Sequence, residues 1–217
     1  MASKQRDLQL TDPMARLLEV RYVVAIDPGN NSGVGAAEVG GGFLGQAKVT
    51  NIEKKTAKGK AGPPQRIGFV QAALCGEEGK AMEYLALIED AALSSFPSQS
   101  AAAGFVTSRT RWFDALRSDP VCIGVANYHV ISWRKSADLW TLRQALGRGT
   151  PWKEVAQVWL RRRAGVEAVS HDAAEAAVMA LQAAAMLHKG FMTVEVAANG
   201  ECTVKLGGKP ITYMGTS

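Results

Sequence analysis

Short apolar runs rich in β-branched and aromatic side chains are the strongest pattern along the chain. Residues 22–26 read Y-V-V-A-I and predict a buried strand over about residues 21–27. Similar runs at residues 33–39 and 43–50 flank the turn at 40–42, so we expect three antiparallel strands at the start. The run at residues 121–125 predicts a further buried strand.

Other segments repeat their apolar positions every three to four residues, which is typical of helices. In the predicted helix at residues 136–146, Ser136 is the expected N-cap and Gly147 ends the helix. These strands and helices together indicate an α/β domain. The predicted helices cover residues 80–96, 109–117, 136–146, 152–163 and 169–189.

The remaining segments are expected to be irregular or to extend the domain. Residues 1–20 resemble a polar arm and residues 97–104 a linker of small residues, whereas 191–217 form a C-terminal β extension. That extension alternates around Asn199-Gly200, which predicts a hairpin. The main body of the chain then spans residues 21–190.

Composition and charge narrow the class of protein. The chain has 217 residues, 47% of them apolar and 21% charged, and no apolar run approaches the ~20 residues of a membrane span. A polar N-terminus lacks a secretory signal, and three separated cysteines suit a reducing cytoplasm. The net charge of +5 suggests a polyanionic partner.

An acidic residue ends the first predicted strand. Asp27 follows the apolar run directly and precedes Pro28-Gly29, which cannot continue a regular ladder. A carboxylate there is costly to bury unless it is paired or binds a metal. The alternative is an Asp that only begins a turn.

Two more acids lie on the last predicted helix. Asp172 and Glu175 are three residues apart and share a face that is otherwise rich in alanine. If that face packs on the strand of Asp27, three carboxylates converge, and hard cations such as Mg²⁺ or Mn²⁺ prefer these oxygen ligands. The alternative is that both acids only complement the helix dipole.

Basic residues are concentrated in two places. The segment at residues 51–66, which Pro63-Pro64 and several glycines predict to be a loop, carries most of them, and the helix at 152–163 ends in three arginines. They are candidates for contacts with phosphates, although a charged run is also common in a solvated loop. The candidates are Lys54, Lys55, Lys58, Lys60, Arg66, Arg161, Arg162 and Arg163.

Two of these motifs together resemble a known family. The segment A-I-D-P-G-N-N-S-G-V-G resembles the opening of the RuvC family of Holliday-junction resolvases, and H-D-A-A-E-A-A-V-M-A-L resembles that family's acidic C-terminal helix. The resemblance covers about residues 21–189 and implies an RNase H-like fold, a mixed sheet with helices on both faces. Glu175, where many cellular relatives have Asp, is more similar to the phage branch.

The resemblance also implies a fourth acid, a Glu that ends the fourth strand. We read residues 121–125 as that strand, so Ala126 occupies the expected position. The chain would then be inactive or badly impaired, either as an engineered Glu-to-Ala variant, which we favour, or as a natural DNA-binding protein.

The implied function is that of a crossover junction endodeoxyribonuclease, which cuts four-way and related branched DNA. Asp27, Asp172 and Glu175 would hold two Mg²⁺ or Mn²⁺ ions, which activate a water for phosphodiester hydrolysis. Asn30, Asn31 and Ser32 could position the cut strand. Two symmetric nicks imply a homodimer, with the helix at 136–146 as a candidate interface through Leu139, Trp140, Leu142 and Leu146. The alternatives are a non-catalytic binder of branched DNA and an actin-like ATPase.

Overall fold

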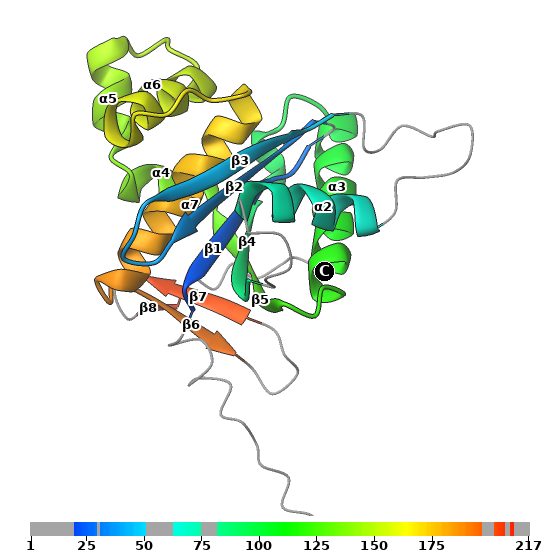
Figure 1. The fold of residues 1–217 in the computed structure, drawn as a ribbon. Helices are drawn as coiled ribbons and strands as arrows, with labels where there is room; N and C mark the ends of the chain where they lie inside the picture. The colour runs from blue at the N-terminus through cyan, green and yellow to red at the C-terminus, as the bar shows by residue number, and fades with distance from the viewer. Residues whose placement is uncertain are drawn as a thin grey trace, which may run out of the picture.

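A single mixed sheet forms the centre of the molecule (Figure 1). The computed structural model describes residues 20–29, 31–50, 63–74, 82–196, 202–206 and 209–210. The strand order is β3-β2-β1-β4-β5-β7-β6, and β8 pairs with β7. The strands are β1 Tyr22–Asp27, β2 Ser32–Glu38, β3 Phe43–Val49, β4 Tyr84–Asp90, β5 Cys122–His129, β6 Met192–Val196, β7 Cys202–Leu206 and β8 Lys209–Pro210.

The first three strands are antiparallel, as the sequence predicts, and β4 and β5 run parallel to β1. However, β4 lies where the sequence predicts a helix at residues 80–96, so that prediction is wrong. The first six residues of β4, Y-L-A-L-I-E, are all buried, because this central strand is covered on both faces. A short continuous apolar run cannot be assigned to helix or strand by periodicity alone.

Helices cover both faces of the sheet (Figure 1). Helix α7 lies across β1–β3 on one face, and α4, α5 and α6 continue that layer beyond the sheet. Helices α2 and α3 cover the other face around a second apolar core. The helices are α2 Pro63–Leu74, α3 Gln99–Arg117, α4 Val130–Ser136, α5 Leu139–Leu146, α6 Trp152–Ala164 and α7 His171–His188, with a 3₁₀ turn η1 at Leu93–Ser95. The predicted α/β class, a mixed sheet with helices on both faces, is confirmed.

Two segments predicted to be irregular are helical. Helix α2 begins at Pro63, because proline lacks an N–H that the first turn does not need. The predicted linker at 97–104 is the start of α3, where the Ser98 hydroxyl caps the helix by accepting from the Ala101 N–H. Small residues, four of them alanine or glycine, therefore continue a helix here.

The helix predicted at residues 136–146 begins three residues later, at Leu139, as α5. Ser136 ends α4 and donates its hydroxyl to the Ser132 carbonyl, so it is not an N-cap. The break falls at Asp138, whose φ of 55° lies in the left-handed region. Gly147 ends α5 as predicted, with a φ of 113°, and the predictions of α6 and α7 are confirmed within about one or two residues.

The C-terminal strands extend the sheet. β6 and β7 form the predicted antiparallel hairpin, although its turn at 197–201 lies outside the described residues. β7 also pairs in parallel with β5 through Ala126 and Cys202. The predicted arm lies outside the described residues up to position 19, so the division into an arm, a body and an extension remains a prediction. None of the helices in the described ranges is long and apolar enough to cross a membrane.

Candidate functional site

Two glycines of β2 bring α7 close to the sheet. A Cβ on Gly33 would lie 2.0 Å from the Asp172 carbonyl oxygen, and one on Gly35 would lie 2.4 Å from the Ala177 nitrogen. Only glycine permits this approach. Since Gly33 pairs with Asp27 across β1 and β2, the start of α7 lies over the end of β1. The predicted convergence of Asp27 with the acidic helix therefore has a specific cause.

A fourth acid, Glu89 of β4, joins this group. β1 and β4 are parallel neighbours with Ile26 opposite Ile88, so Asp27 and Glu89 occupy equivalent positions at the ends of the two strands. The charges of Glu89 and Glu175 both act on Asp27, so the three carboxyl groups lie close together. Asp27, Glu89 and Glu175 are 8%, 6% and 3% exposed. Sequence reasoning missed Glu89, although an apolar run followed by an acid is also the pattern that identified Asp27.

Two basic side chains reach into the acidic group. The Arg134 Nη2 donates to Glu175 Oε1 at 2.8 Å and lies 4.0 Å from Glu89 Oε1. Lys153, at the start of α6, forms an ion pair with Asp172. The indole N–H of Trp133 donates to Glu89 Oε1 at 3.3 Å. The sequence gives no periodic signal for these contacts, because α4 and α6 reach the site only through the tertiary fold.

Burial and the neighbouring acids together outweigh the effect of these cations on Asp27 and Glu175. Burial, then the charges of Glu89 and Glu175, raises the pKa of Asp27 well above its ordinary value. Burial, then Glu89, raises the pKa of Glu175 from 4.5 to about 7, despite opposing contributions from Arg134 and Lys153. Four carboxylates therefore face two cations, and the site favours additional positive charge or protons.

This arrangement predicts how stability depends on pH without metal. Because the folded-state pKa of Glu175 is higher than its unfolded value, the folded protein keeps a proton that the unfolded chain loses between about pH 4.5 and 7. The free energy of unfolding should therefore fall as the pH rises through this window. In EDTA, Glu175→Gln should melt about 3 °C higher than the wild type at pH 8, but at nearly the same temperature at pH 4.5.

Thermal unfolding of both proteins across this pH range tests the prediction. Their difference isolates the loss of the Glu175 carboxyl together with its effect on Asp27, whose pKa the Glu175 charge raises. A melting-temperature difference that is constant from pH 4.5 to 8 would show that Glu175 does not hold the extra proton.

The donor set suits a hard divalent cation, because it consists of carboxylates whose charge is incompletely balanced. As arranged, however, no group of three or more His, Cys, Asp or Glu residues in the described part of the chain meets the geometry of a metal site. Arg134 and Lys153 hold Glu175 and Asp172, so binding an ion would require these two ion pairs to rearrange. The chemistry of the residues fits such an ion, although these side-chain positions do not yet form its site.

Ala126 does not lie at the end of the fourth strand. It is in the middle of β5, the fifth strand in sequence, and it is 1% exposed in the same apolar core as Leu87 and Tyr128. Reading residues 121–125 as the fourth strand is therefore wrong, because β4 was taken for a helix. The argument for an inactive Glu-to-Ala variant no longer holds.

Placing a carboxylate at Ala126 should damage the fold. We expect Ala126→Glu to lower the free energy of unfolding by about 3 kcal/mol or more, because it buries an unpaired charge in an apolar core. Urea denaturation measures this change. Asn127→Glu, at an exposed neighbour on the same strand, is the matched control and should be nearly neutral. If Ala126→Glu instead cut DNA faster than the wild type, the fourth acid would belong at position 126.

The loop after Asp27 is held by internal hydrogen bonds. The Ser32 hydroxyl is fully buried, donates to the Gly29 carbonyl and accepts from the Trp112 indole N–H at 3.0 Å. The predicted contact of Ser32 with DNA is therefore wrong, since this side chain supports the loop from inside. Asn31 is exposed, whereas Asn30 lies outside the described residues.

Of the five basic residues predicted to contact phosphates at residues 51–66, the structure describes only Arg66. Arg66 is 2% exposed and its guanidinium lies 5.7 Å from the centre of the Trp112 ring, so it is part of the core between α2 and α3 rather than a surface contact. Its burial contradicts the predicted phosphate contact. The four predicted lysines, Lys54, Lys55, Lys58 and Lys60, lie outside the described residues.

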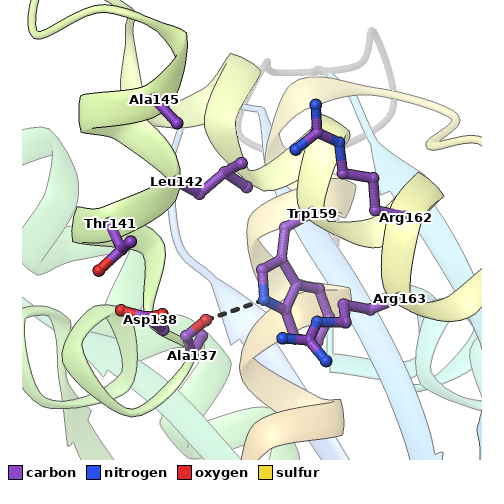
Figure 2. A pocket seen from close by; sticks show the side chains of 8 residues that line it. All are labelled: Ala137, Asp138, Thr141, Leu142, Ala145, Trp159, Arg162 and Arg163. Carbon is purple, nitrogen blue, oxygen red and sulfur yellow. Dashed lines mark hydrogen bonds between the residues drawn. The ribbon is translucent and has the colours of Figure 1, made fainter.

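The three arginines at the end of α6 are exposed, as phosphate contact would require. Arg161 pairs with Glu167 at 2.9 Å. Arg162 and Arg163 line a cavity of about 330 Å³ between α5 and α6 (Figure 2). Its floor includes Trp159, whose indole N–H donates to the Ala137 carbonyl. Their role in DNA binding remains a prediction.

The candidate dimer helix is only partly exposed. Leu139 is fully buried and Leu142 packs against the core, whereas Trp140 and Leu146 are 45% and 36% exposed. Half of the predicted stripe therefore belongs to the core of a single chain.

The fold is similar to that of a known junction resolvase. The structure of T. thermophilus RuvC in complex with a Holliday junction substrate matches with a TM-score of 0.55 and 17% sequence identity, over 78% of this chain and 96% of that chain. No family model matches the sequence, and no curated protein matches it. At this low identity the similarity concerns the fold: the chain has a RuvC-like, RNase H-type architecture.

Proposed function

We propose that this chain is a divalent-metal-dependent endonuclease that cuts four-way and related branched DNA. The observation that carries the proposal is the position of Glu89, which adds a third buried carboxylate to Asp27 and Glu175. Asp172 is linked to this group through Lys153, which pairs with it and also acts on Asp27 and Glu175. The RuvC-like fold supports it, because the solved structure of similar fold contains a Holliday junction. The basic net charge of +5 also suits DNA.

The four acids would hold Mg²⁺ or Mn²⁺, two ions in the full scheme. Such ions supply Lewis-acid activation of the attacking water and of the leaving 3′ oxygen. Asp27 and Glu89 lie at the ends of rigid neighbouring strands, and Asp172 and Glu175 lie in the first turns of α7. The sheet and the close contact of α7 with β2 therefore fix the backbone positions of the four acids, and the side chains of Asp172 and Glu175 would leave Lys153 and Arg134 to bind an ion.

The basic residues of the site have separate tasks. Arg134 bonds Glu175 and approaches Glu89, and its charge opposes the rise in the pKa of Glu175 that burial and Glu89 cause. Lys153 is 50% exposed and bonds only Asp172 among the contacts of the site, so it can turn toward a phosphate when the acids bind cations. No step requires a covalent protein intermediate, because water is the nucleophile.

Two symmetric nicks at a junction would require two such sites, and we propose a two-fold homodimer for this reason. A protein that acts on DNA branches in this way would work in the cytoplasm of a bacterial or phage-infected cell.

The test is cleavage of a synthetic four-way junction in Mg²⁺ and in Mn²⁺, beside a linear duplex of the same sequence. We expect paired nicks in the junction, none in the duplex and none in EDTA. If the chain binds the junction tightly but never cuts it in either metal, the alternative of a non-catalytic branched-DNA-binding protein replaces this proposal.

A further inference from the structure

An exposed tryptophan lies on the helical layer beside the acidic site. Trp140 of α5 is 45% exposed, whereas Trp112 and Trp133 are fully buried in the two cores. Its ring contacts that of Trp152 at a centroid distance of 4.6 Å and an interplanar angle of 76°. This perpendicular contact holds the Trp140 ring in place.

Trp152 is the support of this pair. The guanidinium of Arg143 lies 4.5 Å from the centre of the Trp152 ring, and that of Arg134 lies 5.0 Å from it. Arg143 also donates to the Thr150 carbonyl at 2.8 Å, which ties the end of α5 to the start of α6. With two arginines on Trp152, Trp140 is the ring of the pair that remains open to a ligand.

The surroundings of Trp140 are basic and continuous with the acidic site. Residues 130–153 contain five basic side chains and one acidic one. Arg134 contacts both the Trp152 ring and the Glu175 carboxylate. Lys153, the residue after Trp152 at the start of α6, forms an ion pair with Asp172. A DNA strand whose phosphate lies at the acids would therefore pass beside Trp140.

We propose that Trp140 stacks on an unpaired base of the DNA, next to the phosphate held at the acidic site. The inference rests on the proposed function and names the part of the substrate that the site recognises. Unstacked bases are available at branch points, and aromatic side chains bind them without regard to sequence. The charge favours DNA over a second copy of the chain, because a two-fold contact here would place like charges together.

Equilibrium binding of the full chain in Ca²⁺ tests this inference with three ligands: a four-way junction, a matched linear duplex and an oligo-dT single strand. Trp140→Ala should weaken binding of the junction and of oligo-dT about tenfold, and change duplex binding by less than about twofold. Trp140→Phe should retain most of the affinity. Leu146→Ala, at another exposed apolar residue of α5, is the matched control and should bind as the wild type does.

The outcomes separate this inference from the proposed function. If the wild type prefers the junction but Trp140→Ala binds junction and oligo-dT normally, the stacking role is overturned and the function stands. If oligo-dT binding depends on Trp140 but the junction is not preferred over the duplex, the stacking role stands and the proposed function falls. If light scattering shows that Trp140→Ala converts a dimer into a monomer, the surface is a subunit contact and the inference is overturned.

Discussion

Glu89→Gln is expected to reduce the rate of junction cleavage by about 1,000-fold, which corresponds to about 4 kcal/mol of transition-state stabilisation. Gln preserves the size of the side chain and its ability to accept from the Trp133 indole, but it removes one of the four negative charges. Because Asp27 and Glu175 both feel the charge of Glu89, the amide also weakens the field that attracts cations. Single-turnover cleavage of a four-way junction in Mg²⁺ measures the effect.

The loss of activity should not be accompanied by a loss of stability. Removing a buried charge from between two other acids relieves repulsion, so Glu89→Gln should melt at or above the wild-type temperature in EDTA. Glu83→Gln, at an exposed acid just before the opposite end of β4, is the matched control and should cut normally. Normal cleavage by Glu89→Gln would remove Glu89 from the site and would also remove the main support for the proposed nuclease.

Three of the four acids could be predicted from local sequence, for a physical reason. Asp27 ends a strand at a Pro-Gly turn, and Asp172 and Glu175 interrupt an alanine-rich helix face, so each is conspicuous within its own segment. Glu89 is followed by another acid, Asp90, at the end of a run that is apolar at consecutive positions. Such a run fits a buried helix or a buried strand equally well, and only pairing with β1 decides between them.

The same mistake shifted the assignment of Ala126. If residues 84–90 are a helix, β5 is counted as the fourth strand, and Ala126 then lies where the resemblance implies a catalytic Glu. Because residues 84–90 form β4, that position belongs to Glu89 instead. In the sheet, β4 pairs with both β1 and β5, so β4 is the fourth strand and β5 the fifth. The burial of Ser32 and Arg66 was equally invisible to local patterns, because both side chains meet Trp112 from distant parts of the chain.

A large effect on both the fold and the position of the acidic helix is expected from a substitution at Gly33. We expect Gly33→Ala to lower the free energy of unfolding by about 3 kcal/mol, because the new methyl group would meet the α7 backbone. Its Cβ would lie 2.0 Å from the Asp172 carbonyl oxygen and 2.5 Å from the Ala173 nitrogen, and neither can move without moving the helix. Urea denaturation in EDTA measures the change.

The same substitution should also impair cleavage, since Asp172 is displaced from Asp27 when α7 moves. Gly68→Ala is the matched control: nothing lies within 4 Å of a Cβ at that position in α2, and alanine is the better helix former. Gly68→Ala should therefore be neutral or slightly stabilising and should cut normally. If Gly33→Ala were as stable and as active as the wild type, the close contact between β2 and α7 would not be what brings the acidic helix to the end of β1.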